Sequence, residues 1–136
     1  SGIGTGGTIT GVGQLLKSKN PDVKIFGVEP AASPILNGGE PGKHPLQGIG
    51  ANFVPPVLDR KIYDEIFDAP SDLSVKYARA AGTTEGILAG LSSGAALWAA
   101  HQVAQRAEFA GKTIVVIIPS FGERYISTIL FEDLLG

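Results

Sequence analysis

The sequence predicts an α/β fold in which a mostly parallel sheet is flanked by helices. Two observations predict this class. Short apolar runs rich in β-branched residues alternate with longer segments in which apolar residues recur at helical spacing. In addition, 136 residues with 43% hydrophobic and 18% charged content can bury one sizeable core. We therefore expect residues 1–136 to form a single α/β domain.

The first elements expected are a helix and a strand. From Thr8 the apolar residues recur at helical spacing, and Asn20-Pro21 ends the pattern shortly after two lysines. Residues 23–28 (VKIFGV) are typical of a buried strand, which Glu29-Pro30 closes. Residues 30–47 contain four prolines and three glycines, which predicts a long irregular loop of the kind that is often functional.

A second strand and a second helix follow this loop. The strand is expected near residues 63–67, after the break at Pro55-Pro56. Ser71 is a suitable N-cap for the helix. We expect this helix to end at Gly82, because glycine readily adopts the left-handed conformation that ends many helices.

An alanine-rich helix and a strongly apolar strand complete the expected fold. The helix is predicted from Ser93 to about Ala107, and Ser92 or Ser93 would cap it. Residues 113–118 (TIVVII) are strongly β-branched and end at Pro119, which predicts a strand covered on both faces. Because ligands bind beyond the carboxyl ends of parallel strands, we expect the functional residues at the junctions between strands and helices.

The composition excludes several classes of protein. A formal net charge of −2 gives no electrostatic reason to expect nucleic acid as a partner. No apolar run approaches the roughly 20 residues that span a bilayer, so no membrane partner is expected. The lack of cysteine excludes disulfides and zinc–thiolate sites. The chain has 19 glycines and no methionine and starts directly in a glycine-rich loop, so we expect a piece of a longer enzyme.

The opening loop, residues 1–8 (SGIGTGGT), leads directly into the first helix. Glycines let successive backbone N–H groups converge on an anion, and the helix N-terminus adds unpaired donors. Thr5 and Thr8 offer hydroxyl groups at the same place, and the loop has no lysine or arginine. This pattern favours a phosphate that stays bound. Two alternatives remain: a turn needed only for packing, and a dinucleotide site, because residues 2–7 match G-x-G-x-x-G and Glu29 ends a strand about 20 residues later.

Three further junctions carry candidate residues. In residues 90–96 (GLSSGAA), one serine hydroxyl is available to a ligand and the other to cap the helix. A Ser-His-Asp hydrolase is disfavoured, because His44 lies in the irregular loop and His101 is expected to face solvent in mid-helix.

Pro119 provides a rigid apolar ring at the next junction. For Glu123-Arg124-Tyr125, which follow it, we favour a local ion pair and packing. Residues 47–51 (QGIGA) form a tight turn that can bring backbone amides to a small substrate.

Taken in order, these segments resemble the C-terminal half of the cysteine synthases (O-acetylserine sulfhydrylases), which are fold-type II pyridoxal-phosphate-dependent enzymes. The resemblance covers essentially the whole chain and implies most of one lobe of a two-lobed enzyme. The matching segments are GTGGTITG (residues 4–11), VEP (28–30), QGIGA (47–51), GLSSGAA (90–96) and PSFGERYISTILF (119–131).

The resemblance implies a role for each matched site residue. Ser92 would bond the pyridine nitrogen of pyridoxal 5′-phosphate, with Pro119 against the ring, and Gly48 and Ala51 would line the amino-acid pocket. A neutral hydroxyl at that nitrogen leaves it largely unprotonated, which favours prompt β-elimination. The residues that would cradle the 5′-phosphate are Gly4, Thr5, Gly6, Gly7 and Thr8.

The implied reaction is a β-replacement in which sulfide displaces acetate from O-acetylserine to give cysteine. The Schiff-base lysine of the family lies in the N-terminal half, so no catalytic residue is assigned here and the chain is expected to be inactive alone. The family further implies a homodimer, binding of serine acetyltransferase, and a cytoplasmic location, with an organelle as the alternative. The alternatives for function are a cystathionine β-synthase-like or β-cyanoalanine synthase-like enzyme and a non-catalytic dinucleotide-binding or regulatory module.

Overall fold

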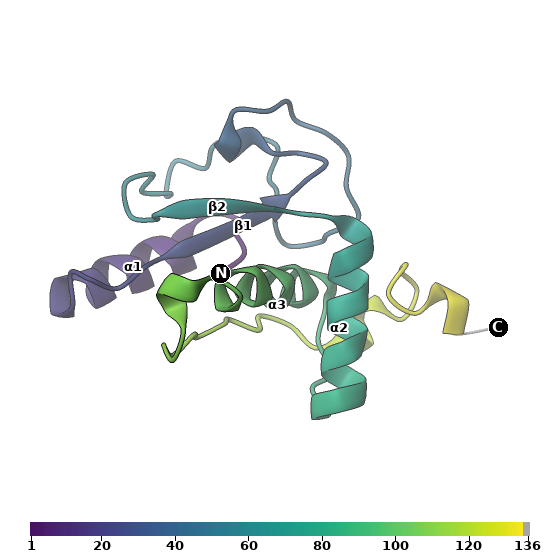
Figure 1. Ribbon diagram of the computed structural model, residues 1–136. Coiled ribbons are helices and arrows are strands. Elements are labelled where there is room, and N and C mark those ends of the chain that lie inside the picture. Colours follow the sequence, from purple (N-terminus) through teal and green to yellow (C-terminus); the bar gives the residue numbers. More distant parts are fainter. Residues whose placement is uncertain (135–136) are drawn as a thin grey trace.

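The computed structural model describes residues 1–134, and a small parallel sheet lies at its centre (Figure 1). Strands β1 (Phe26–Pro30) and β2 (Glu65–Ala69) pair in parallel, with Phe26 opposite Glu65 and Pro30 opposite Ala69. On the other side of β1, Gly2 forms a parallel bridge with Val28. The start of the chain therefore lies beside β1, on the edge away from β2.

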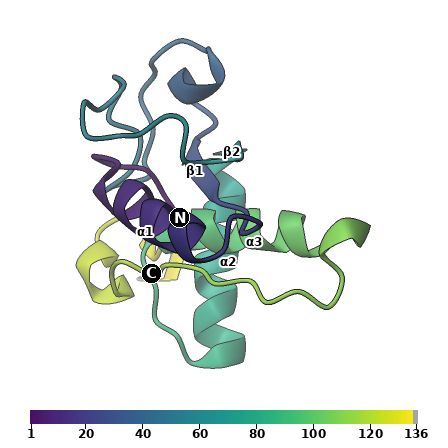
Figure 2. The ribbon, with the colours of Figure 1, turned by 90° about the vertical axis from the view of Figure 1, so that its left-hand side faces the viewer.

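Helices cover both faces of this sheet. Because side chains alternate along a strand, Phe67 of β2 packs in one core with Ala95 and Ala99 of α3 (Leu91–Ala104). Its neighbour Ile66 packs in a second core with Ile9 of α1 (Gly7–Lys19). α2 (Ser71–Glu85) packs against α3, and the long segment 31–64 lies on the side of the sheet away from both (Figures 1 and 2). The expected α/β class with a parallel sheet is confirmed.

The boundaries of the first elements differ modestly from the prediction. α1 ends at Lys19 as expected, before Asn20. β1 begins at Phe26 and includes Glu29 and Pro30, and β2 lies two residues later than expected. Pairing in register between these two strands sets where they start and end, and this pairing is not visible in either segment alone.

Both predicted ends of the second helix are wrong. Pro70, in an extended conformation, is the residue before α2, and Ser71 is its first helical residue and makes no cap. The helix continues through Gly82 to Glu85, and Gly86 (φ 69°) is the residue that adopts the left-handed conformation. Its N–H bonds to the carbonyl groups of Ala81 and Gly82, as a helix C-terminus requires.

The predicted strand at residues 113–118 is not formed. These residues are extended, but none of the backbone–backbone hydrogen bonds found among residues 1–134 involves residues 113–119. Ile114, Ile117 and Ile118 are each more than one third exposed, and Val115 is 81% exposed. The segment therefore has the composition of an interior strand without a partner strand.

Among residues 1–134, no helix is long and apolar enough to cross a membrane.

Candidate cofactor and substrate site

The glycine loop presents a row of free backbone donors at the start of α1. The first bond of the helix runs from the Thr10 N–H to the Gly6 carbonyl. The N–H groups of residues 4–9 donate to no protein group among the described residues. Gly6 precedes the helix in a left-handed conformation (φ 86°), and no side chain caps the helix. A helix N-terminus with consecutive unpaired N–H groups is a site that suits a phosphate.

Two of these glycines are required by close contacts. A Cβ on Gly4 would lie 2.5 Å from the carbonyl oxygen of Gly48, and a Cβ on Gly6 would lie 2.7 Å from the Cβ of Leu58. No side chain fits at either position without moving the backbone. Thr5, Gly7 and Thr8 are exposed beside them, so the loop is open to solvent on the side where a ligand would bind.

The turn at residues 47–51 lies directly against the glycine loop. The Gly50 N–H donates to the Ile3 carbonyl at 3.1 Å, and Gly48 approaches Gly4 as described. Both Gly48 (φ 89°) and Gly50 (φ 67°) have left-handed backbone conformations that favour glycine. The structure thus brings together the segment predicted to hold the phosphate and the segment predicted to line the substrate pocket, with Gly48 and Ala51 exposed.

Three residues that the sequence analysis did not assign to this turn hold it in place. The His44 Nε2 lies 2.9 Å from the Gly50 carbonyl oxygen. The Ser33 hydroxyl lies 2.7 Å from Oδ1 of Asn52, which is the one non-glycine residue with positive φ among the described residues. These contacts join separate parts of an irregular loop, and no periodicity or motif in the sequence signals them.

The serine junction forms a second group of predicted residues. The Gly90 N–H donates to the Ser120 carbonyl at 3.1 Å, and Ala89 pairs with Phe121 in an antiparallel bridge. This contact brings residue 120, next to the exposed Pro119, to the start of α3, where Ser92 lies. Ile49 and Leu91, which adjoin Gly48 and Ser92, belong to the same hydrophobic core, so one core supports both groups.

The predicted serine cap of α3 is wrong. α3 starts at Leu91, after an extended Gly90, so Ser92 and Ser93 lie inside its first turn. A Cβ on Gly90 would lie 2.3 Å from Cε2 of Tyr125, so tertiary packing requires glycine where a capping side chain would stand. Ser92 is 4% exposed, and the buried Ser93 hydroxyl has no hydrogen-bond partner among the described residues. The two hydroxyls are therefore not used to begin the helix.

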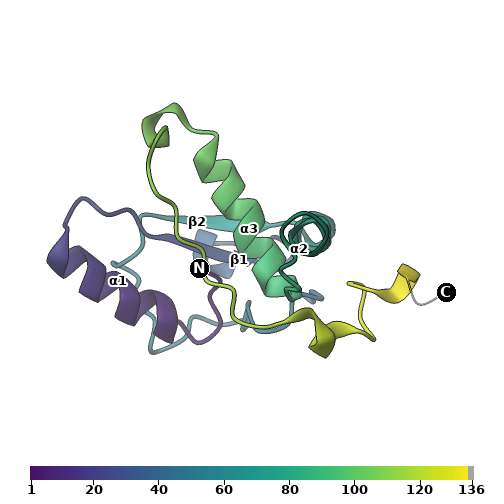
Figure 3. The ribbon, with the colours of Figure 1, turned by 90° about the horizontal axis from the view of Figure 1, so that it is seen from below.

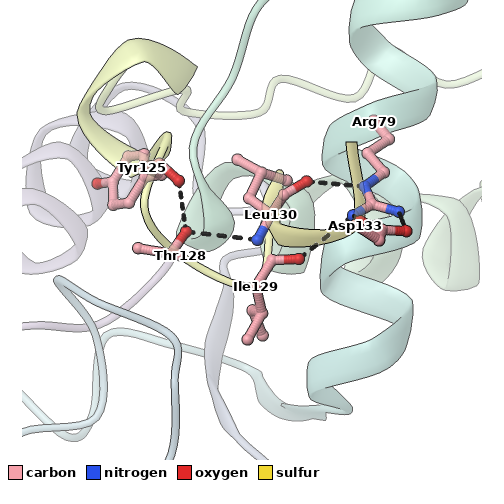
Figure 4. A network of polar contacts seen from close by, with 6 residues as sticks. All are labelled: Arg79, Tyr125, Thr128, Ile129, Leu130 and Asp133. Atoms are coloured by element: carbon pink, nitrogen blue, oxygen red, sulfur yellow. Dashed lines mark hydrogen bonds and ion pairs between the residues drawn. The ribbon is translucent and has the colours of Figure 1, made fainter. Parts of the chain in front are cut away.

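The segment after Pro119 is anchored to the protein on its far side. Tyr125 is buried, and its hydroxyl lies 2.8 Å from that of Ser120. Farther along, the Arg79 Nε donates to the Leu130 carbonyl at 2.8 Å, and the Arg79 guanidinium forms an ion pair with Asp133 (Figure 4). The expected packing near residues 123–125 is present, but among the described residues no ion pair involves Glu123 or Arg124.

Glu29, the residue that a dinucleotide site requires, is engaged in the protein itself. Its side chain is 1% exposed, and its two carboxylate oxygens accept the N–H groups of Leu36 at 2.9 Å and Asn37 at 3.1 Å. Burial raises the pKa of Glu29 to about 7, against the two N–H donors, and nearby Asp68 also raises it. A carboxylate used in this way is not available to a ribose hydroxyl.

Neither histidine is placed as a base for the serines. His44 contacts the Gly50 carbonyl, and exposed His101 contacts the Tyr77 hydroxyl and Gln105. No group of three or more His, Asp or Glu residues within residues 1–134 could hold a metal ion. Lys17 and Lys24 pair with Asp64, and the other lysines are exposed, so none is held at the glycine loop.

Comparison with known proteins identifies the family. The family model described as "pyridoxal-phosphate dependent enzyme" matches residues 1–120. The chain belongs to this family. It is 51% identical over 132 residues to a cysteine synthase of Staphylococcus aureus (strain Mu50), which covers 97% of this chain and 42% of that protein.

Solved structures give the same result. A cysteine synthase from Entamoeba histolytica matches with a TM-score of 0.95 and 45% identity over 96% of this chain and 39% of that one. An O-ureido-L-serine synthase matches with a TM-score of 0.93 and 39% identity over 97% of this chain and 42% of that one. The chain thus forms part of a fold-type II domain and spans about two fifths of the length of these relatives. Relatives named for different activities match it about equally well in structure.

Proposed function

We propose that this chain is part of a cysteine synthase that replaces the acetate of O-acetylserine with sulfide. The observation that carries the proposal is the row of N–H groups at residues 4–9, which point to no protein acceptor at the start of α1. The 51% identity to a cysteine synthase supports the choice within the family. The engaged carboxylate of Glu29 counts against a dinucleotide module.

The residues present fit the phosphate group of pyridoxal 5′-phosphate. Gly4 and Gly6 allow a backbone path that no larger residue can follow, and Thr5 and Thr8 add exposed hydroxyls. The binding is proposed to depend on backbone dipoles and hydroxyls, because the loop carries no cationic side chain. Gly7 leaves the first helical N–H open to the ligand.

In the proposed mechanism, the other site residues orient the reactants. The cofactor, when bound, supplies an electron sink that acidifies the Cα–H of an amino acid. Ser92 would donate one hydrogen bond to the pyridine nitrogen without adding a charge, and Pro119 would pack beside the ring. Gly48 and Ala51 would leave room for a small amino acid and offer backbone groups to it.

The lysine that takes the α-proton is not assigned in this chain. We therefore propose that the chain acts only together with the remaining part of the enzyme. By the same resemblance, we propose a homodimer that also binds serine acetyltransferase, in the cytoplasm. Cystathionine β-synthase-like and β-cyanoalanine synthase-like activities are the alternatives, and assays with sulfide, homocysteine and cyanide as nucleophiles distinguish them.

The test uses the complete enzyme that contains this chain. Replacing Thr5 and Thr8 together by alanine is expected to weaken cofactor retention by roughly 1–3 kcal/mol, because two hydroxyls to a charged phosphate are lost. Cofactor content after dialysis, measured by absorbance, is the readout. The matched control replaces Thr83 and Thr84, which are exposed on α2 and bond only to their own helix. Equal cofactor content in both double variants would count against the phosphate site.

A second pair of variants tests the serine. Ser92→Ala is expected to keep the cofactor but to lower turnover of O-acetylserine with sulfide, whereas Ser93→Ala, its buried neighbour, is the control. The visible band should respond to O-acetylserine and return with sulfide in the unaltered enzyme. Full activity of Ser92→Ala would remove its role at the ring.

A further inference from the structure

Two carboxyl groups stand next to each other near the end of the parallel strands. Glu29 of β1 is paired with Asp68 of β2 in the ladder, so both side chains project from the same face of the sheet. Figures 1 and 3 show the two strands running beside each other. Glu29 is 1% exposed and Asp68 is half-buried. Like charges at paired positions of a sheet repel each other, and burial strengthens this repulsion.

One residue of the long loop binds both carboxyl groups. The Asn37 N–H donates to Glu29 Oε1 at 3.1 Å. The side-chain amide of Asn37 donates to Asp68 Oδ1 at 2.9 Å and to the Ile66 carbonyl at 3.1 Å. The neighbouring N–H of Leu36 donates to Glu29 Oε2 at 2.9 Å. The short helix η1 (Ile35–Asn37) is therefore held on the sheet through the two carboxyl groups.

The surroundings of this pair do not neutralise two negative charges. Among residues 1–134, neither Glu29 nor Asp68 forms an ion pair. η1 presents N–H groups and an amide, and α1 packs on the same face through apolar side chains. The exposed Arg60 guanidinium contacts the Leu36 carbonyl at 3.4 Å and the Tyr63 hydroxyl at 3.5 Å. Two facing carboxyl groups in such surroundings are more stable when they hold one proton between them.

A shared proton replaces the repulsion with a hydrogen bond. A protonated Glu29 can donate its O–H to the Asp68 carboxylate while its other oxygen still accepts an N–H from η1. Burial raises the pKa of Glu29 to about 7, and Asp68 also raises it, so this proton is lost close to neutral pH. Because the two strands are fixed to each other by their ladder, the repulsion that follows is relieved at η1.

The segment before η1 also supports the turn at residues 47–51. The Ser33 hydroxyl, two residues before η1, donates to Asn52 Oδ1 at 2.7 Å. Gly42 packs so closely on Ala32 that a Cβ on Gly42 would lie 2.1 Å from the Ala32 carbonyl oxygen. Residues 32 and 33 thus contact the chain on both sides of the turn. A looser η1 leaves these residues less restrained, and the turn with them.

We propose that Glu29 and Asp68 share one proton that holds η1 on the sheet, and that loss of this proton as the pH rises loosens residues 33–39 and the turn at residues 47–51. The loop that carries the turn is then firm in mild acid and loose in mild base. This inference is independent of the proposed function, because it concerns the loop itself and requires neither a cofactor nor a reaction.

The experiment follows amide hydrogen exchange by mass spectrometry in the complete enzyme that contains this chain, between about pH 5.5 and pH 8.5. Each rate is compared with that of an unprotected amide at the same pH, which removes the ordinary effect of pH on exchange. Residues 33–39 are expected to lose protection at least about tenfold, and residues 47–52 at least about threefold, with a common midpoint near pH 7. Peptides from α3 are the internal reference and should keep their protection.

A substitution of the second carboxyl group tests whether the proton is shared. Asp68→Asn keeps an oxygen for the Asn37 amide and removes one charge, so the loss of protection is expected to shrink and its midpoint to fall by about one pH unit or more. Asp22→Asn, the same change at an exposed position before β1, is the control and should leave both unchanged. Glu29→Gln cannot ionise and is expected to keep residues 33–39 protected at every pH.

Four results would overturn the proposal. Asp68→Asn could leave the midpoint and the size of the loss unchanged, which would assign the proton to another group. Residues 33–39 could stay equally protected at every pH in the unaltered enzyme. They could lose protection while residues 47–52 keep theirs, so that η1 does not control the turn. Finally, α3 could lose protection with the same midpoint, which would show that the whole domain opens rather than the loop.

Discussion

Residues 23–30 and residues 113–119 are both expected to contain a buried strand but reach different structures. Each run is short, includes several β-branched residues and ends at a proline. The first contains β1, which pairs with β2 along its whole length and buries Val28 to 1% exposure. The second is extended, lacks backbone partners among the described residues, and leaves Val115 81% exposed. The difference shows that composition favours a strand, whereas pairing with a neighbouring strand is needed to form it.

The largest expected effect comes from the same substitution made in each run. Val28→Asp places a charge in the core beside Leu91 and Phe67 and is expected to lower the free energy of unfolding by more than about 3 kcal/mol. Val115→Asp, on the unpaired run, is expected to change it by less than about 0.5 kcal/mol. Urea unfolding followed by circular dichroism measures both.

The comparison would fail if the two aspartate variants lost similar stability. That result would mean that residues 113–118 are packed in solution against something that the isolated chain provides.

The sequence predicted the parts of this molecule that depend on local chemistry. The glycine loop and the turn at residues 47–51 were identified because a backbone in close contact with another backbone leaves room for glycine alone, as Gly4 against Gly48 shows. α1 was predicted closely because its periodicity and its end at Asn20 are both local signals.

The errors arise where distant residues decide the outcome. Gly90 replaces a serine cap because the ring of Tyr125 occupies the space beside it. A strand at residues 113–118 is expected from the composition, but these residues pair with no strand among the described residues. The supports of the turn at residues 47–51, His44 and Ser33, act through contacts that join separate parts of a loop. None of these effects leaves a pattern in a short window of sequence.

Glu29, near the end of β1, makes the stability of the folded chain depend on pH. Burial raises the pKa of Glu29 to about 7, above its usual value of 4.5. The folded chain therefore holds this proton more tightly than the unfolded chain. The resulting stability is fully present below about pH 4.5 and is lost as the pH rises to about 7, by on the order of 2–3 kcal/mol.

Glu29→Gln is expected to remove this decline, because an amide does not titrate. The free energy of unfolding, measured between pH 4.5 and pH 7.5, should fall less for Glu29→Gln than for the unaltered chain. Glu40→Gln, at an exposed position of the following loop, is the control and should keep the decline. An identical decline in the unaltered chain and in Glu29→Gln would assign the pH dependence to other groups.

The smallest expected effect concerns the contact between Gly90 and Ser120, which directly follows the unpaired residues 113–119. Gly90→Ala would put a Cβ 2.3 Å from the Tyr125 ring and 2.7 Å from the Ser120 Oγ, so Tyr125 must move. We expect a loss of about 1–2 kcal/mol in the free energy of unfolding, with faster amide exchange confined to residues 88–90 and 120–125. Gly11→Ala is the control, because it lies in α1 with open space around it and should stabilise the chain by about 0.5–1 kcal/mol. Faster exchange in β1 as well would show that the two runs are coupled through the core that Val28 and Tyr125 share, and the contrast between a paired run and an independent one would then have to be abandoned.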